Sequence, residues 1–387
     1  MQPVILSPEQ EKVLKSILKW YENPSKQYLS LGGYAGTGKT TILGYLRKVL
    51  HQKSSKLKIA FCAFTGKASL VLKSTLENIG ALYSSDTVST IHSLIYTPII
   101  DDEERIIGWE RKEKIDADFI IIDEASMVSE DLFRDLLGYG IPILAVGDHG
   151  QLPPIRGRFN LMGSPDLRLE TIFRQAKGNP IIDVSVMARK TGEIPVKKFS
   201  DTVIKYSKFD AEHLEDINDL LESYNQETLL LCGYNHTRVR LNKHIRSILD
   251  FTSPYPEVGD KVICLRNNYK KGVYNGMTGT IQSIESVDDT WYNASILMED
   301  GFVFSGLILK AQFNSTVSFN QTNKRKMTIG GDLFDFGYAI TVHKAQGSQA
   351  KRVILFEERF KKMDDQMWKR WLYTGVTRAI EELYIIG

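Results

Sequence analysis

The residues with the clearest chemistry form a glycine-rich run, GYAGTGKT, over 33–40. It follows a short apolar run and precedes a segment with helical periodicity. Glycines let the backbone N–H groups turn toward phosphate oxygens, and the start of a following helix favours anions. Lys39 would reach the β- and γ-phosphates, and Thr40 would bind Mg²⁺ through its hydroxyl. The other residues that we expect around the phosphates are Gly33, Ala35, Gly36, Thr37, Gly38 and Thr41.

Two further polar clusters follow apolar, β-branched runs. In IIIDEAS, Asp123 would hold Mg²⁺, and Glu124 would accept a proton from the attacking water. In AVGDHGQLPP, the Gln151 amide both donates and accepts, which suits it to hold a water near the γ-phosphate. Because ligands collect at the carboxyl ends of parallel strands, both runs are predicted to meet the nucleotide. We interpret His149 as a loop residue without a partner.

Two arginines lie in different halves of the chain. Arg174 belongs to LETIFRQ, and Arg378 belongs to WLYTGVTRA near the C-terminus. An arginine aimed at a γ-phosphate stabilises the charge that spreads during phosphoryl transfer. A single arginine on a helix is usually solvated or paired with a surface acid. One arginine from each half would instead suit a cleft between two domains.

Composition limits the class of protein. The chain has 387 residues, enough for two or three domains, and its net charge of +2 leaves nucleic-acid affinity to local clusters. We find no apolar run of about 18 residues and no secretory signal, so we expect no membrane span. Cys62, Cys232 and Cys264 are far apart, which favours buried thiols in a reducing compartment over disulfides or a zinc site.

The pattern of elements indicates an α/β fold. A capping box at 7–10 begins the first helix, and alternating strands and helices then predict a mostly parallel sheet. The strand-like runs are 58–64, 119–123 and 141–147, and the helical ones are 41–50, 68–79 and 130–137. The second half repeats this style, except over about 258–319. There, short runs with glycine turns predict a small inserted β barrel.

The order of the motifs resembles that of superfamily 1 helicases, and closely the branch of RecD and the phage Dda helicase. The resemblance spans about residues 6–386. It rests on SPEQ (7–10), GYAGTGKT (33–40), FTGKA (64–68), STIH (89–92), IDEAS (122–126), GDHGQLPP (147–154), FRQ (173–175), TVHKAQGS (341–348) and YTGVTRA (373–379). YNGMTGTI, starting at Tyr274, is similar to the start of the SH3-like barrel of that branch.

The resemblance implies two RecA-like P-loop domains with parallel sheets, which bind ATP and Mg²⁺ in the cleft between them. The first domain would be 1–176, with a hairpin insertion at about 93–116. The second would be 177–262 together with 332–387, and the SH3-like β barrel would be 263–331.

The family roles transfer motif by motif. Gln10 would recognise adenine, although the capping box makes a competing use of its side chain. Gln151 would connect the γ-phosphate to the nucleic-acid strand, and Arg174 and Arg378 would be the two arginine fingers. Gly347, next to Gln346, would lie near the cleft and contact the nucleotide.

The resemblance also implies a surface for single-stranded DNA. Hydroxyl groups and neutral imidazoles suit hydrogen bonds to phosphates that break at each step, although His92 and His343 would also fit as satisfied structural histidines. The segment 96–109 fits the hairpin that splits a duplex with Pro98, Ile99 or Trp109, or an ordinary connecting loop. The candidate strand contacts are Thr65, Lys67, Ser89, Thr90, His92, Pro98, Thr341, His343 and Lys344.

We therefore expect an ATP-dependent DNA helicase or translocase, moving 5′ to 3′ by resemblance. Its partners would be single-stranded DNA and forked or tailed duplexes, with replication or recombination proteins as further candidates. We expect a monomer in the cytoplasm of a bacterium or a phage-infected host. The alternative is a nucleotide-switched ATPase that binds DNA or protein without unwinding. A small-molecule kinase is disfavoured by the two separated arginine motifs and the inserted barrel.

Overall fold

The computed structural model describes residues 6–100, 106–154, 159–172, 178–268, 270–319, 328 and 330–387. The chain divides into two compact units, Met1–Lys177 and Gly178–Gly387. Among the helices within these described ranges, none has the length and apolar character needed to cross a membrane.

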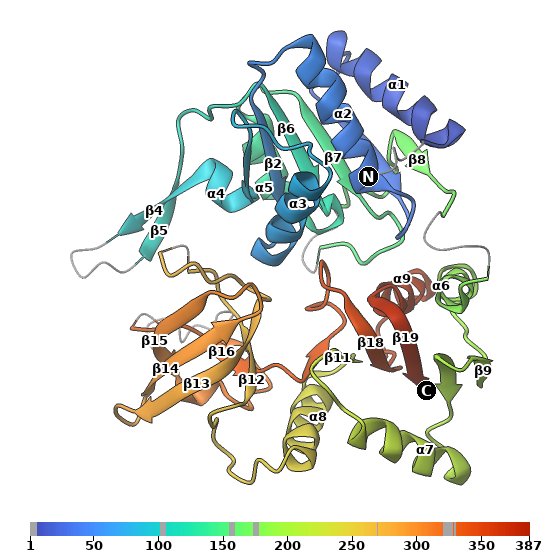
Figure 1. The fold of residues 1–387 in the computed structure, drawn as a ribbon, viewed down its shortest axis with the longest axis vertical. Helices are drawn as coiled ribbons and strands as arrows, with labels where there is room; N and C mark the ends of the chain where they lie inside the picture. The colour runs from blue at the N-terminus through green and yellow to red at the C-terminus, as the bar shows by residue number, and fades with distance from the viewer. Residues whose placement is uncertain are drawn as a thin grey trace. The chain divides into compact units, whose positions relative to one another are not determined.

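The first unit is built on a six-stranded parallel sheet with strand order β3-β2-β6-β7-β1-β8 (Figure 1). Its strands are β1 (Tyr28–Gly33), β2 (Ile59–Ala63), β3 (Thr87–Thr90), β6 (Phe119–Asp123), β7 (Ile143–Gly147) and β8 (Leu167–Leu169). Its helices are α1 (Pro8–Glu22), α2 (Lys39–Lys53), α3 (Gly66–Asn78), α4 (Ile91–Ile95) and α5 (Glu130–Leu137), with a 3₁₀ turn at Ala125–Met127.

Successive side chains of each central strand point to opposite faces of this sheet and pack into two apolar cores, one on each face. Phe119 and Ile121 of β6 pack into the core that includes α1, α2 and α3. Ile120 and Ile122 point the other way, into the core that includes α4 and α5. Strands buried on both faces are typical of parallel sheets covered by helices, which explains the continuous apolar runs in the sequence.

A buried ion pair fixes α2 against the segment that leads into β3. The Arg47 Nε donates to an Asp86 carboxylate oxygen at 2.8 Å, and both side chains are fully buried. Asp86 also accepts from the backbone N–H groups of Ile59 and Tyr83, at 3.3 and 3.0 Å. This one carboxylate therefore holds the phosphate-loop helix, β2 and the start of β3 together.

We expect Asp86→Ala to lower the free energy of unfolding by about 3–5 kcal/mol, because it leaves the Arg47 charge buried without its partner. Urea denaturation measures the change. The matched control is Glu22→Ala, which breaks a half-exposed pair with Lys53 at the other end of α2 and should cost at most about 1 kcal/mol. Equal losses in the two variants would contradict the prediction.

The second unit contains another six-stranded sheet, with order β17-β11-β18-β19-β10-β9. Its strands are parallel except for the pairing of β9 with β10. The strands are β9 (Lys197–Ser200), β10 (Val203–Tyr206), β11 (Thr228–Cys232), β17 (Ala339–Thr341), β18 (Ala350–Phe356) and β19 (Ala379–Ile386). The helices are α6 (Pro180–Lys190), α7 (Ala211–Glu222), α8 (Asn235–Ile248) and α9 (Asp365–Val376).

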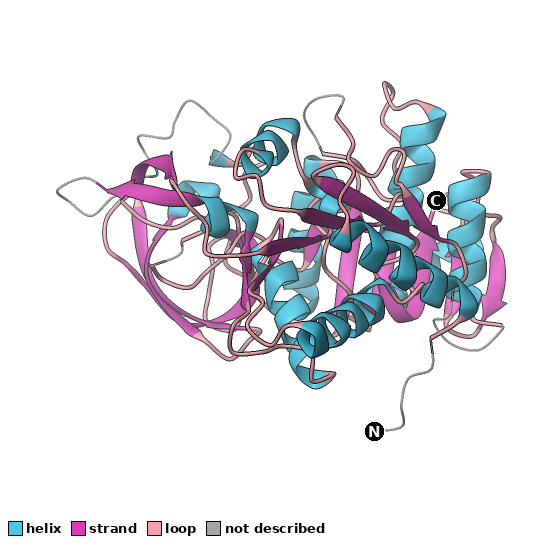
Figure 2. Cartoon of the chain, turned by 90° about the horizontal axis from the view of Figure 1, so that it is seen from above, coloured by secondary structure: helices cyan, strands magenta, loops and turns pink. Residues whose placement is uncertain are grey.

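A five-stranded antiparallel sheet, here called the inserted sheet, interrupts this unit between α8 and β17. Its strand order is β15-β14-β13-β12-β16. The strands are β12 (Lys261–Cys264), β13 (Thr278–Ser286), β14 (Trp291–Met298), β15 (Val303–Leu309) and β16 (Phe334–Phe336), with a 3₁₀ turn at Lys310–Gln312. Its long strands curve, as the view from above shows (Figure 2). It begins and ends a few residues outside the expected segment 263–331, because β12 and β16 pair with each other.

Candidate functional site

The glycine-rich run forms a tight loop between β1 and α2. Gly36 and Gly38 both have φ near 79°, a left-handed conformation that glycine adopts without strain. The Lys39 ammonium donates across the loop to the carbonyl oxygens of Gly33 and Tyr34, at 2.8 and 3.1 Å. Lys39 therefore occupies the centre of the loop, where it could exchange these neutral acceptors for phosphate oxygens.

The other expected phosphate ligands lie on the same loop and on the first turn of α2. Thr37 is fully buried, and its hydroxyl donates to the Tyr34 carbonyl at 2.9 Å, which stiffens the turn. Ala35 precedes Gly36, and Thr40 and Thr41 follow Lys39 at the start of the helix. The structure thus brings the whole loop set together.

The carboxyl end of β6 carries Asp123 and Glu124. Burial raises the pKa of Asp123, and the nearby Lys39 charge acts in the opposite direction. Glu124 has φ near 52°, which turns the chain sharply after the strand. The Lys39 ammonium is near enough to act on the Asp123 carboxylate. Mg²⁺ typically takes one or two protein oxygens and completes its shell with phosphates and water, so Thr40 and Asp123 fit it.

Gln151 lies beyond β7, the neighbour of β6, and is only 4% exposed. Its Nε2 donates to Asp148 at 3.3 Å. Its Oε1 is buried and makes no hydrogen bond to any part of the chain that the structure describes. A buried amide oxygen without a donor is costly unless a ligand or water supplies one, so Gln151 fits a water beside a phosphate.

His149 is a functional candidate that the sequence interpretation missed. Its ring lies against that of Tyr34 in the phosphate loop, with centroids 4.3 Å apart. Burial lowers its pKa, so the imidazole is neutral near pH 7. The loop that carries Gln151 therefore touches the phosphate loop through His149. Sequence spacing gave no signal for this pair, because 115 positions separate the rings.

Gln10 holds two partners at once. Its Oε1 accepts from the Ser7 N–H at 3.0 Å, and its own N–H donates to the Ser7 hydroxyl at 3.2 Å, which confirms the capping box. Its Nε2 donates to the Thr37 carbonyl at 3.0 Å. The cap uses Oε1 of the amide, and Nε2 lies at the loop 33–40. Capping of α1 therefore leaves Nε2 for the expected contact with adenine.

Paired variants separate these roles. Ser7→Ala and Gln10→Ala both break the capping box, which should cost about 1 kcal/mol of stability. Only Gln10→Ala also removes the amide at the loop, so it alone should raise the KM for ATP, by about tenfold for one hydrogen bond. ATP titrations and thermal unfolding of both variants provide the measurement. Equal KM values would leave Gln10 with the capping role alone.

The two expected arginine fingers are Arg174 and Arg378. Arg174 lies outside the described residues. Arg378, in the second unit, is 3% exposed and donates to the carbonyl oxygens of Thr374 and Ser348, both at 3.0 Å. Its third partner is the hydroxyl of Thr377, at 3.2 Å. The charge is thus held among neutral acceptors, an arrangement that favours an incoming anion.

The expected strand contacts of the first unit lie where β2 and β3 end. The Thr65 hydroxyl accepts from the Ala68 N–H at 3.2 Å and caps α3. The Thr90 hydroxyl caps α4 in the same way, at 3.1 Å from the Ser93 nitrogen. Both hydroxyls are therefore fixed in place by helix starts. Lys67, Ser89 and His92 lie on the same segments.

Both candidate histidines are held partly inside the protein. Burial lowers the pKa of His92 and of His343, so both imidazoles are neutral near pH 7, in agreement with the sequence interpretation. The His92 ring lies 5.7 Å from that of Tyr96, and the His343 ring 6.5 Å from that of Phe360.

The segment after α4 is a β-hairpin and not an irregular loop. Strand β4 (Tyr96–Ile100) pairs antiparallel with β5 (Ile106–Arg111). Pro98 lies opposite Trp109, and the Trp109 side chain is 37% exposed. The hairpin therefore places a proline opposite an aromatic residue, and the duplex-splitting role of this segment stays a prediction.

In the second unit, the residues after β17 form a compact turn that holds Thr341, His343 and Lys344. The Lys344 N–H donates to the Thr341 carbonyl at 2.9 Å, and the Lys344 ammonium donates to Asn275 in the connection between β12 and β13. Gly347 has φ near 76°, and the neighbouring Gln346 is buried.

Comparisons with known proteins agree with this arrangement. Residues 5–203 match the family described as AAA domain, and residues 336–386 match the UvrD-like helicase C-terminal domain. The chain is 26% identical to the ATP-dependent RecD2 DNA helicase of Deinococcus radiodurans, over 99% of this chain and 49% of the relative. It is 22% identical to the ATP-dependent DNA helicase Dda of Enterobacteria phage T4, over 93% and 94%. The chain thus spans about half the length of RecD2.

The fold is similar to that of the Bacteroides Pif1 helicase solved with ADP-AlF3 and single-stranded DNA. The TM-score is 0.57 at 20% identity, covering 99% of this chain and 92% of the other. The parallel sheets are accordingly those typical of RecA-like helicase domains. The C-terminal segment matches the UvrD-like helicase C-terminal domain, and the whole chain is similar to the RecD2 and Dda helicases. Because the AAA-domain match covers slightly more than half of the chain, the chain belongs to the AAA-domain family.

Proposed function

We infer that this protein is an ATP-dependent DNA helicase that moves along single-stranded DNA and unwinds duplexes. The observation that carries the proposal is the order β3-β2-β6-β7-β1 in one parallel sheet. The ends of β1, β6 and β7 lead to the nucleotide residues, and the adjacent ends of β2 and β3 lead to the strand-contact residues. A conformational change caused by hydrolysis of the γ-phosphate would therefore reach the DNA contacts through adjacent strands of one sheet.

Each nucleotide residue has a chemical role in this proposal. Lys39 would neutralise the β- and γ-phosphates, while Thr40 and Asp123 would hold Mg²⁺. Glu124 accepts the proton of the attacking water, and Gln151 holds that water through its unpaired amide oxygen. Arg174 and Arg378 stabilise the transition-state charge from two different segments, and Gly347 lets the backbone approach the nucleotide.

The strand residues of both units grip phosphates through hydrogen bonds and through the charges of Lys67 and Lys344. We assign the inserted sheet as the SH3-like domain and the β4–β5 hairpin as the wedge that meets the first base pair with Pro98. The finer parts of the proposal are 5′-to-3′ movement on forked or tailed DNA, action as a monomer, and contact with replication or recombination proteins. Three buried, free cysteines support a reducing location such as the cytoplasm.

Two measurements test the function. ATP turnover should rise on addition of single-stranded DNA, and duplexes with a 5′ tail should be displaced faster than those with a 3′ tail. Turnover indifferent to DNA would favour the nucleotide-switched binding module. DNA-stimulated turnover without displacement on either tail would reduce the proposal to a translocase.

Lys344 predicts a pH dependence of DNA binding. Burial lowers the pKa of its ammonium to about 8, and a lysine is charged only below its pKa. One phosphate contact should therefore be present near pH 7 and lost as the pH rises through 8. The slope of log affinity against log salt should shrink by about one between about pH 7 and about pH 9. Lys344→Met should show the shallow slope at both; an unchanged wild-type slope would contradict the assignment.

A further inference from the structure

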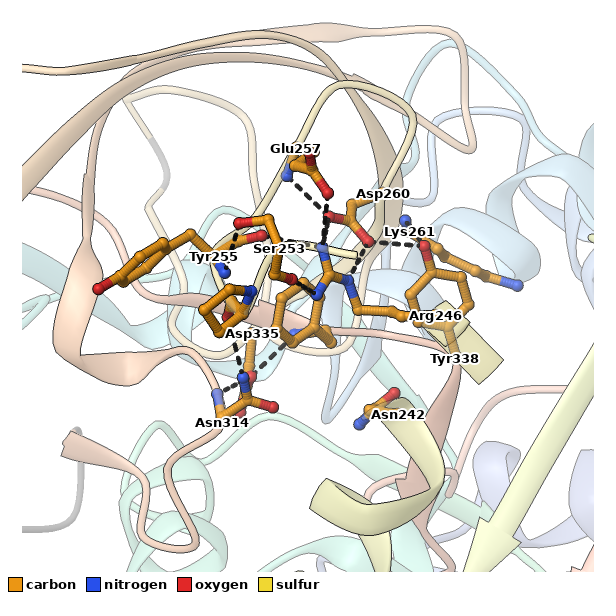
Figure 3. A network of polar contacts seen from close by, with 12 residues as sticks. Asn242, Arg246, Ser253, Tyr255, Glu257, Asp260, Lys261, Asn314, Asp335 and Tyr338 are labelled. Carbon is orange, nitrogen blue, oxygen red and sulfur yellow. Dashed lines mark hydrogen bonds and ion pairs between the residues drawn. The ribbon is translucent and has the colours of Figure 1, made fainter. Parts of the chain in front are cut away.

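Helix α8 carries a stripe of polar side chains that face two chain segments. These segments join the inserted sheet to the α/β part of the second unit. Arg238, Asn242 and Arg246 are spaced by four residues, so they share one face of the helix. Figure 3 shows Asn242 and Arg246 with the residues around them. The outgoing segment is 253–261, and the returning segment is 335–339.

Arg246 binds the outgoing segment through its whole guanidinium group. Its Nε and Nη2 donate to the two oxygens of Asp260, at 2.8 and 2.9 Å, and Nη2 also reaches the Tyr255 carbonyl at 2.8 Å (Figure 3). Its Nη1 donates to the Ser253 carbonyl. Asp260 is fully buried and Arg246 is 4% exposed. The ring of Phe336, in the returning segment, lies 4.4 Å from the guanidinium.

The other two members of the stripe bind the returning segment. Arg238 donates to Asp335, the middle residue of β16, at 2.8 Å, and this carboxylate is 1% exposed. Asn242 donates to the Ala339 carbonyl at 3.1 Å and accepts from the Ala339 N–H at 2.8 Å. Ala339 begins β17, only two residues before Thr341.

A further link joins the two segments directly. The Tyr338 hydroxyl donates to Asp260 at 2.8 Å and accepts from the Lys261 N–H at 3.0 Å (Figure 3). In the turn after β17, Lys344 contacts Asn275, which lies in the connection between β12 and β13. The start and the end of the insertion are therefore joined to each other and to α8. The turn 341–348 follows β17, which α8 binds at Ala339, and it touches the connection between β12 and β13 through Lys344.

A network of buried ion pairs adds little net free energy of folding. Burying two ion pairs costs much of what their attraction returns, and apolar side chains of similar volume often stabilise a protein as well or better. What buried ion pairs and bidentate amides supply is a fixed geometry, since each bond is directional. The two joining segments would otherwise leave the inserted sheet attached by a flexible pair of tethers.

We propose that Arg238, Asn242 and Arg246 are positioning residues that lock the inserted sheet and the turn 341–348 into one rigid body with α8. This deepens the proposed function, on which the assignment of the turn to DNA binding rests. The consequence is that a movement of the second α/β sheet moves the turn and the inserted sheet by the same amount, because the joining segments 253–261 and 335–339 do not bend.

The direct test measures rigidity in the full-length protein. Spin labels are attached at Glu215→Cys on α7 and Asp289→Cys between β13 and β14, both exposed positions. The native cysteines are buried, so they should react little with the label. The label-to-label distance distribution should broaden in Arg238→Met and in Arg246→Met. The matched control is Lys205→Met, which breaks another buried ion pair of the same unit, with Glu357, away from the insertion.

A distribution in Arg246→Met and Arg238→Met as narrow as in wild type would overturn the proposal, as would equal broadening in Lys205→Met. If the methionine variants fail to fold, Arg246→Lys serves instead. A lysine keeps the charge but cannot span Asp260, Ser253 and Tyr255 together, so it should broaden the distribution too.

A second measurement connects rigidity to function. Stimulation of ATP turnover by single-stranded DNA should fall by about 2- to 30-fold in the stripe variants, and this fall should exceed any change in turnover without DNA. The same stimulation in wild type and variants would refute the functional consequence. If wild type itself shows no stimulation, the proposed function fails, whereas the label distances still decide whether the stripe is a rigid lock.

Discussion

ATP turnover by Lys39→Ala is expected to fall by about 100- to 1000-fold, which would be one of the two largest effects of any single change in this protein. The ammonium already spans the loop between two carbonyl oxygens, so it is positioned before any phosphate arrives. Removing it takes away a preorganised charge at the point where negative charge develops on the transferred group. Steady-state hydrolysis with and without single-stranded DNA measures the loss.

The control for this variant is Lys53→Ala, at the other end of α2. Lys53 is half-exposed and pairs with Glu22 at the surface, so its loss should leave turnover unchanged. Nucleotide binding, measured by fluorescence titration, should separate the two steps in Lys39→Ala. Turnover within about twofold of wild type would refute the assignment of this loop as the hydrolysis site.

Arg378→Ala is expected to lower the turnover number by about 1000-fold or more, the usual effect of removing an arginine finger. The side chain is buried and held by neutral oxygens, so its charge is available to an anion at little cost in rearrangement. Because a finger acts on the transition state, the KM for ATP should change far less than the turnover number. Rapid-quench hydrolysis provides the measurement.

Arg378→Lys distinguishes a catalytic from a structural role. Lysine keeps a positive charge but loses the fork of donors that reaches Ser348 and Thr374 together. A catalytic role predicts partial turnover in this variant with unfolding close to that of wild type. If turnover falls only in proportion to the fraction unfolded in both variants, Arg378 holds the end of α9 and is not a finger.

Much of the parallel-sheet architecture could be predicted from local patterns. The run FIIID gave β6 at its observed bounds, because a strand buried on both faces needs an unbroken apolar run. The capping box placed the start of α1 for a similarly local reason. The first and last residues of the inserted sheet could not be predicted as well from local patterns. They depend on the pairing of Val262 with Phe336, which are more than seventy positions apart.

Within the candidate site, the pattern predicted a tight glycine loop over 33–40 and placed Asp123 and Gln151 at or beyond strand ends, where the structure has them. Their roles toward a nucleotide stay predictions. Pattern alone missed the ring contact of His149 with Tyr34, because nothing local records which loops meet above a sheet. It likewise missed the polar stripe of α8, whose arginines look like ordinary surface charge in the sequence. Only the fold shows that Arg246 and Arg238 point inward, at Asp260 and Asp335.

The pairing of β12 with β16 has a consequence for how this chain can change. The first and last strands of the inserted sheet lie side by side. Helix α8 binds Asp260 just before the first strand and Asp335 within the last strand, so the segment between Cys264 and Phe334 starts and ends at one place. A segment whose two ends meet can be lengthened, shortened or exchanged with little strain on its host. We therefore expect the segment between β12 and β16 to tolerate changes of length or sequence with little effect on the stability of the surrounding α/β sheet.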